Sequence, residues 1–226
     1  MSDIRQQIKF SHVLKYTIGM ISISFGVVFM LRSDIGNSSW DTLHYSLDAL
    51  LHDTLGISWF TIGWAMILVA TIFTILVIIL TKNYKYLFMF VPILLVGRFV
   101  DVVNLYIMVD FLPSTIFLRI VSYVLGVILL PLGGALLLSS TYPAGVFDEF
   151  MFAVARKLKT EKIVIIRVIM ELTAVLVALT TGFIAGIGFG KIGIGTLIFS
   201  LLVGTILKYI LMILEKLGLY KDKQNY

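Results

Sequence analysis

The residues best suited to chemistry in this 226-residue chain are ionic side chains inside long apolar segments. Arg98 and Asp101 lie three positions apart in one segment, and Arg167 and Glu171 lie four positions apart in another. Because a charge at the bilayer centre costs on the order of 2.5–3.5 kcal/mol, such groups face a protein interior or a wet cavity. One hypothesis is a polar site in which the two acids bind a cation or carry a proton and the arginines bind an anion or act as gates. The other is that both pairs are neutralised structural contacts.

A second group of candidates stands in the two connections 33–57 and 139–162. In each, turn-forming residues precede an acid and a helical run, which is typical of a helix start. If these short helices dip into the membrane, their N-termini form an anion or carboxylate site, and the acids are caps or cation ligands. If they lie flat at the interface, the same residues are surface caps. The residues are Asn37, Ser38, Ser39 and Asp41 in the first connection and Ala144, Gly145 and Asp148 in the second.

The first short helix also offers a weak metal-site pattern. Asp41, His44, Asp48 and His52 project within about one helical face, as divalent-metal ligands would. An exposed polar face looks the same, so no metal is the preferred interpretation. The letters of a dinucleotide motif at 188–193 follow an apolar span rather than a strand, so we expect no cofactor. No nucleophile–base pair is visible, so we expect that the protein is not an enzyme.

These residues must be positioned by membrane helices. Hydrophobic residues make up 59% of the chain and charged residues only 14%, and the mean hydropathy is +1.03. A soluble domain is nearer 45–50% apolar and about 25% charged. The apolar blocks are close to the roughly 20 residues that cross a bilayer as a helix, and they do not alternate as barrel strands do. We predict spans at 10–31, 58–81, 86–108, 115–138, 163–185 and 193–214.

The basic residues predict the orientation of these spans. Twelve lysines and arginines flank the spans on one side and three, Arg32, Arg119 and Lys191, on the other. Since the basic side is cytoplasmic, both termini are predicted to lie in the cytoplasm. The net charge of +5 is explained by this flanking, so we expect no nucleic-acid partner.

A fixed offset of 107 residues relates the two parts of the chain. Gly26 matches Gly133, Trp40-Asp41 matches Phe147-Asp148, and Gly97 matches Gly204. Several matches at one offset indicate an internal duplication. Three spans per half force the second half to enter from the opposite side, so we predict inverted repeats. The fold class is therefore all-α and polytopic, one membrane domain over 1–226 with repeats at about 10–108 and 115–215, each with a re-entrant or interfacial helix after its first span.

Five short motifs occur in a specific order over most of the chain. They are Gly36 to Leu47 with its Trp40-Asp41-x-Leu43-His44 core, Val96-Gly97-x-x-Val100-Asp101, Gly145-x-x-Asp148, Arg167-x-x-x-Glu171 and Gly193-x-Gly195-Thr196. Together they resemble the YczE/YitT-type family of bacterial integral membrane proteins, closer to its YczE side. The resemblance implies a multi-pass protein of the bacterial cytoplasmic membrane, and no settled molecular activity comes with it.

Two functions from different classes fit these observations. One is a carrier for an unidentified small molecule or ion that works by alternating access between inverted halves. The other is a non-transporting partner, either an importer's substrate-binding subunit or a scaffold for a partner enzyme. Besides the lipid bilayer, the partners left open are a second copy of the chain and another membrane protein.

Overall fold

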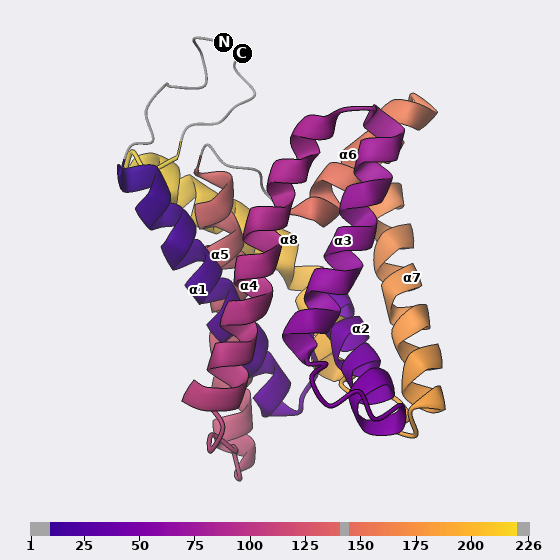
Figure 1. Cartoon of the computed structure of the whole chain (residues 1–226). Coiled ribbons are helices and arrows are strands. Elements are labelled where there is room, and N and C mark those ends of the chain that lie inside the picture. Colours follow the sequence, from indigo (N-terminus) through magenta and orange to yellow (C-terminus); the bar gives the residue numbers. More distant parts are fainter. Residues whose placement is uncertain (1–9, 141–144, 221–226) are drawn as a thin grey trace.

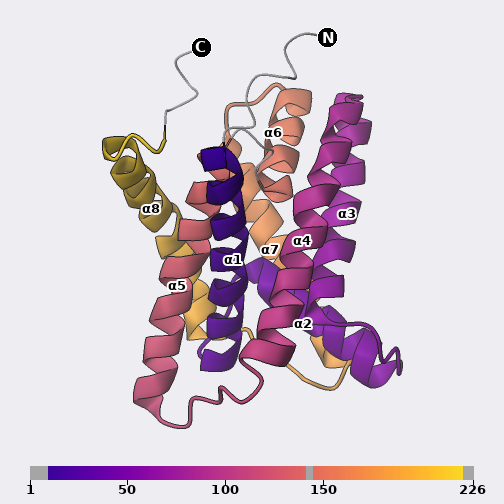
Figure 2. The same cartoon turned by 60° about the vertical axis from the view of Figure 1, so that its left-hand side comes forward.

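The described residues, 10–140 and 145–220 of a computed structural model, form helices and turns and no β-strand (Figures 1 and 2). In chain order the helices are α1 (Phe10–Ser33), α2 (Ser39–Asp48, continued by the π-helical Ala49–Thr54), α3 (Ile62–Thr81), α4 (Phe90–Val102, preceded by the 3₁₀ turn Tyr84–Met89 and continued by the π-helical Val103–Ile107), α5 (Ile116–Leu138), α6 (Val146–Leu158), α7 (Ile163–Ile184) and α8 (Ile194–Lys216). All except α2 and α6 are long and apolar enough to span a membrane, six in the described residues, with α4 counted together with its 3₁₀ and π-helical extensions as Tyr84–Ile107. The predicted all-α fold with six spans is confirmed.

The largest difference from the predicted span ends is at α3. It begins at Ile62 rather than at 58, because Thr61 has an extended backbone and its side chain accepts a hydrogen bond from the Trp64 N–H. This is the usual geometry of a helix N-cap. The first short helix, expected over residues 40–51, begins at Ser39 and continues through a π-helical turn to Thr54.

Helix α1 packs along α5 over most of its length (Figure 1). Gly19 lies against Gly133 and Gly26 lies against Gly126, so the two helices run antiparallel. A Cβ atom added to Gly133 would lie 2.5 Å from the Gly19 carbonyl oxygen, and one added to Gly26 would lie 2.7 Å from the Leu130 nitrogen. Glycine is therefore required for this close approach, as is common where membrane helices cross.

The two short helices pack between the long ones, in opposite parts of the bundle. Helix α2 packs against α7 and α3, and α6 packs against α3 and α7. Helix α1 also contacts α4, and α5 also contacts α8. In both views α6 lies in the upper part of the bundle and α2 in the lower part (Figures 1 and 2).

Helices α7 and α8 form the outside of the bundle. Only 17% of the most apolar stretch of α7 and 11% of that of α8 is buried, against 50% for α1. Large apolar side chains such as Leu176 and Leu201 are exposed there. A bilayer covers such surface at no cost in the hydrophobic effect, so these faces fit contact with lipid.

Candidate functional site

The first turns of α2 and α6 meet through an aromatic contact. The rings of Trp40 and Phe147 are stacked with centroids 3.9 Å apart and planes 14° apart. Phe73 of α3 meets both rings edge-on, at 5.3 Å and 5.2 Å. Stacked and edge-to-face pairs are favourable beyond the area they bury. They fix the two helix starts next to each other.

A cavity of about 280 Å³ lies beside this contact. Residues of all six helices from α1 to α6 line it, and most of them are apolar. The exceptions are Ser38, Asp41 and His44 of the α2 start, the indole of Trp40 and the hydroxyl-bearing Tyr16 of α1. No lysine or arginine of the described residues lines it. The cavity is thus an apolar space with one polar corner.

The polar corner is built on the N-cap of α2. The Ser38 hydroxyl accepts a hydrogen bond from the Asp41 N–H (3.1 Å) and donates one to Asp41 Oδ2 (2.6 Å). Asp41 Oδ1 lies 3.5 Å from His44 Nδ1. All three residues are buried, His44 to 2% exposure. Neither ring nitrogen of His44 has a hydrogen-bond partner among the described groups, and such a buried orphan requires an explanation.

The predicted residues Asn37 and Ser39 are buried beside this corner but do not line the cavity. The Asn37 N–H donates to the Lys191 carbonyl oxygen (3.2 Å), while its side-chain amide has no hydrogen-bond partner within the described part of the chain. The Ser39 carbonyl oxygen accepts from the Thr42 hydroxyl (2.7 Å). Their backbone groups therefore hold the turn before α2 in place.

The start of α6 reaches the same cavity with less polar chemistry. Gly145 is the N-cap of α6, it lines the cavity, and it has no side chain to cap the helix. The Asp148 carboxylate lies close to it, 3.4 Å from where a Gly145 Cβ would stand. Burial raises the pKa of Asp148, and the nearby positive charge of Arg167 opposes that shift. Asp148 and Arg167 are thus brought within electrostatic range of each other. Ala144 lies outside the described residues.

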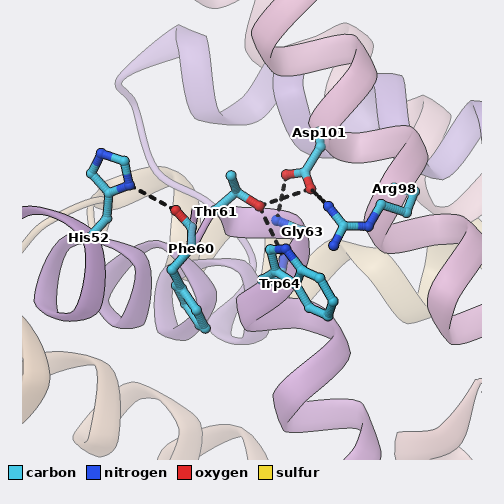
Figure 3. Close-up of polar contacts among 7 residues, drawn as sticks. All are labelled: His52, Phe60, Thr61, Gly63, Trp64, Arg98 and Asp101. Carbon is cyan, nitrogen blue, oxygen red and sulfur yellow. Dashed lines mark hydrogen bonds and ion pairs between the residues drawn. The ribbon is translucent and has the colours of Figure 1, made fainter. Parts of the chain in front are cut away.

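Arg98 and Asp101 form a separate contact between α3 and α4 (Figure 3). The Asp101 carboxylate accepts hydrogen bonds from the Thr61 hydroxyl (2.8 Å), the Gly63 N–H (2.9 Å) and Arg98 Nη1 (2.9 Å). The Arg98 guanidinium carbon lies 3.9 Å from the centroid of the Trp64 ring, a cation–π contact. Asp101 thereby satisfies one of the free N–H groups at the start of α3, that of Gly63. Neither residue lines the cavity, and the geometry matches the structural-pair hypothesis.

Arg167 and Glu171 stay half-buried on α7. They are not among the ion pairs of the described residues, and neither lines the cavity. Their side chains therefore do not join those of α4 in a shared site between the third and fifth spans.

The four residues of the weak metal pattern also do not converge. His52 Nδ1 lies 2.8 Å from the Phe60 carbonyl oxygen, and Asp48 faces a different pocket. In the part of the chain that the structure describes, no three His, Cys, Asp or Glu side chains are close enough to hold a metal ion. Regular spacing on α2 is broken by the π-helical turn, which rotates its last residues away.

Sequence reasoning missed a second pocket of about 440 Å³. It gathers all three basic residues of the sparsely charged side, Arg32, Arg119 and Lys191. Asp34 bridges two of them, with Oδ1 2.8 Å from Lys191 Nζ and Oδ2 3.7 Å from Arg119 Nη1. These three residues are the only basic ones that flank the predicted spans on that side. This was the signal in the sequence from which the pocket could have been predicted.

The turn before α2 is tied to the start of α8 next to this pocket. The Gly195 N–H donates to the Ile35 carbonyl oxygen (3.0 Å), and the Tyr123 hydroxyl donates to the Gly195 carbonyl oxygen (2.6 Å). Gly36 has φ +146° and a Cβ there would lie 2.5 Å from the Thr196 nitrogen, so only glycine fits.

Six apolar spans, two short helices packed between them and a largely apolar cavity define a polytopic α-helical membrane protein. The chain belongs to the family of unknown function DUF6198, whose model matches residues 10–212. It is 31% identical to the uncharacterized membrane protein YczE of Bacillus subtilis over 86% of this chain and 82% of that protein. It is 25% identical to YyaS of the same organism over 93% and 98%, and 23% identical to an uncharacterized protein of Haemophilus influenzae over 93% and 87%. No solved structure matches.

The YczE match confirms the resemblance seen in the sequence motifs. The name of that relative and the six apolar helices support a multi-pass membrane location for this chain.

Proposed function

We propose that this protein is a carrier that moves a small molecule or ion across the bacterial cytoplasmic membrane by alternating access. The observation that supports this is the cavity where the first turns of α2 and α6 meet, because both halves of the chain line it. In many secondary transporters the substrate site lies between inverted repeats and is formed by discontinuous helices.

The proposal includes an inverted duplication of about 10–108 and 115–215. At the offset of 107, α1 to α4 correspond to α5 to α8 in order. The packing pairs exchange accordingly: α2 on α7 is matched by α6 on α3, and α1 on α4 by α5 on α8. A twofold axis in the membrane plane predicts this exchange.

Individual contacts follow the same exchange at the α1–α5 crossing. Gly19 and Gly26 correspond to Gly126 and Gly133, and the contacts Gly19–Gly133 and Gly26–Gly126 map onto each other. Such a reciprocal set of contacts is what a self-complementary, twofold interface gives.

Two contacts join residues that are each other's counterparts. Trp40 stacks on Phe147, and the Ser22 hydroxyl donates to the Leu129 carbonyl oxygen (2.7 Å). Counterparts touch only where an axis of symmetry passes between them. The proposed axis therefore runs through the α1–α5 crossing and the α2–α6 contact, beside the cavity.

In this proposal α2 and α6 are re-entrant and both termini are cytoplasmic. Helix α6 ends with Arg156 and Lys157 on the basic side of the predicted topology, and α2 ends toward the opposite side. Their starts point to the middle of the bundle from opposite sides, as the two half-helices of a transporter do.

The test uses the absence of cysteine from the chain. A single cysteine at Gly134, which lines the cavity and has open space around its Cβ position, reports on access to the cavity. A charged, membrane-impermeant thiol reagent is applied to intact cells and, separately, to inside-out vesicles. Alternating access predicts modification of Gly134→Cys from both sides. The matched control on the same helix is Ile128→Cys, which is 47% exposed on the outer surface of the bundle and should react from neither side.

Reaction of Gly134→Cys from one side alone would overturn the carrier and leave the second candidate, a non-transporting subunit or scaffold. The exposed faces of α7 and α8 fit that candidate, since they are available to a partner protein. In that case a partner should co-purify in stoichiometric amount.

A further inference from the structure

The cavity also indicates which chemical class the carrier binds. We propose that the cavity between α2 and α6 binds a largely apolar organic cation, with its positive charge at the Asp41 carboxylate. This inference rests on the proposed function, because it names the substrate class of the same site.

The charge balance of the cavity favours a cation. Among the described residues that line the cavity, Asp41 is the only carboxylate and there is no lysine or arginine. A buried carboxylate is costly unless it is hydrogen-bonded and paired. Ser38 supplies one hydroxyl, and His44 is the only other titratable group of the α2 start within reach, at 3.5 Å. A cationic ligand neutralises the Asp41 carboxylate, whereas an anionic ligand is repelled by it.

The start of α2 is poorly suited to an anion. Helix N-termini bind anions through unpaired backbone N–H groups. Here the Ser38 hydroxyl already accepts from the Asp41 N–H, and the Asp41 carboxylate itself stands in the first turn. The sequence left open an anion site at the helix N-terminus and a cation site at the acid. The geometry of this turn favours the acid as a cation ligand.

The remaining walls select an organic ion over a metal ion. Inorganic cations such as Ca²⁺ need six or more oxygen ligands, while the polar oxygens at this corner are those of Ser38 and Asp41. The aromatic rings of Tyr16, Trp40 and Phe147 line the space together with aliphatic and methionine side chains. Aromatic rings attract organic cations, quaternary ammonium groups above all.

His44 gives an independent sign that a ligand or water belongs here. Its side chain is 2% exposed, it lines the cavity, and both ring nitrogens lack a hydrogen-bond partner in the described residues. A buried polar group without a partner destabilises the folded state. A bound molecule or a water carried with it satisfies this ring.

The test measures binding to the purified full chain in detergent by calorimetry, with three probes of similar size. They are benzyltrimethylammonium, its uncharged analogue 2,2-dimethyl-3-phenylpropan-1-ol and the anion benzenesulfonate. We expect the cation to bind and the alcohol and the anion to bind at least tenfold more weakly. Equal affinity for cation and anion would overturn the proposal.

Two variants locate the bound cation. Asp41→Asn should weaken cation binding at least tenfold, and Gly134→Leu, which fills the cavity from a position with open space, should abolish it. The matched controls are Asp110→Asn, at an exposed position, and Gly204→Leu, which also has open space but lies on α8 outside the cavity. If Asp41→Asn does not fold, Gly134→Leu against Gly204→Leu decides the question. Unchanged binding in Gly134→Leu would contradict the proposed site.

The outcome is separable from that of the carrier proposal. Cation binding with one-sided access of Gly134→Cys supports a binding protein and refutes the carrier alone. Two-sided access without cation binding refutes the substrate class alone.

Discussion

The two short helices occupy matching places in the fold and differ in chemistry. Helix α2 begins with Ser38, Asp41 and His44 around the cavity. At the offset of 107 the corresponding positions on α6 are Gly145, Asp148 and Met151. Both helices keep the aromatic ring and the acid of the first turn, but the hydroxyl cap and the histidine occur on α2 alone. The aromatic ring that both helices share builds the contact between them, whereas the hydroxyl and the histidine that occur on α2 alone complete the polar corner around Asp41.

The long helices that follow each short helix also differ between the two halves, and again the polar contacts occur in the first half. In the first half α3 and α4 pack along each other, joined by Asp101, whereas in the second half α7 and α8 do not pack along each other. The counterpart of Asp101 is Lys208, and that of Arg98 is Thr205. Helices α3 and α4 therefore form a unit, while α7 and α8 are held through other helices. In the proposed carrier, we expect α3 and α4 to move together.

The largest effect is expected at the crossing that both halves share. Gly133→Leu places side-chain atoms where a Cβ alone already lies 2.5 Å from a backbone oxygen of α1. Because backbone atoms cannot give way cheaply, this variant should lose the folded protein altogether. Gly134→Ala, one position further on the same helix, has nothing within 4 Å of its Cβ and should remain folded. Monodispersity on size-exclusion chromatography in detergent measures both, and a monodisperse Gly133→Leu protein would remove the crossing as the common element of the halves.

A smaller loss is expected where the halves differ most. Asp101→Asn removes the negative charge that pairs with Arg98. It also replaces one of the two carboxylate oxygens, which accept the hydrogen bonds from Thr61 and Gly63, with an amide group that donates. We expect the free energy of unfolding to fall by about 2–3 kcal/mol, less than for a fully buried pair because the Arg98 side chain is 43% exposed. Titration with SDS in mixed micelles measures it.

The control is Lys208→Gln at the corresponding position of the second half, where we expect a change within about 0.5 kcal/mol. Glu171→Gln, at a half-buried position on α7, should be equally mild. If Asp101→Asn lowers the free energy of unfolding no more than Lys208→Gln does, Asp101 does not hold α3 to α4. The difference between the two halves would then not affect stability.

The spans and both short helices could be predicted because their signals are local. Apolar blocks and a turn followed by an acid are readable within about 20 residues. The offset of 107 also matched Trp40 to Phe147, although it did not predict that the two rings stack. The partners of Asp101 could not be predicted, since Thr61 and Gly63 lie 40 and 38 residues away. No local pattern reports such a contact.

The cavity was only partly predictable for the same reason. Ser38, Asp41 and Gly145 were selected from turn chemistry and do line it. His44 was considered only for a metal, and Arg167 and Glu171 were selected because charges in apolar spans are usually functional. Which face of a helix a charge occupies depends on the packing of all the helices, and one sequence does not give that packing.

Asp48, at the C-terminal end of α2, offers a further difference between the two short helices. Its counterpart on α6 is Ala155, so only the first half has an acid there. Burial raises the pKa of Asp48 from 3.8 to about 6, partly opposed by the charge of His52. The folded state thus binds this proton more tightly than the unfolded state, and its stabilising effect is complete below about pH 4 and lost as pH rises to about 6.

Asp48→Asn should remove this pH dependence and raise the thermal midpoint at pH 7 relative to the unmodified chain. Scanning fluorimetry in detergent between pH 4 and pH 7 measures it. Asp110→Asn, at an exposed position after α4, should leave the slope unchanged. An unchanged slope in Asp48→Asn would mean that another group titrates in this range.

The smallest effect is expected at the ionic contact between the halves. Asp34, in the turn after α1, bridges Lys191 and Arg119 of the second half, but its side chain is 53% exposed. Exposed pairs contribute about 0–1 kcal/mol, so Asp34→Asn should lower the free energy of unfolding by less than about 1 kcal/mol, and by less still in high salt. The hydrogen bond from Lys191 lowers the pKa of Asp34 below 3.8, so this contribution is present above about pH 4 and is lost as pH falls through the lowered pKa.

Lys191→Gln removes one of the two ion pairs of Asp34, so its loss should not exceed that of Asp34→Asn, and the double variant should lose no more than Asp34→Asn alone. SDS titration at low and high salt measures all three. A loss of several kcal/mol would mean that charge, rather than the glycine crossing and the aromatic stack, joins the two halves. A small loss fits a contact that can break and re-form, which alternating access requires at one face of the bundle.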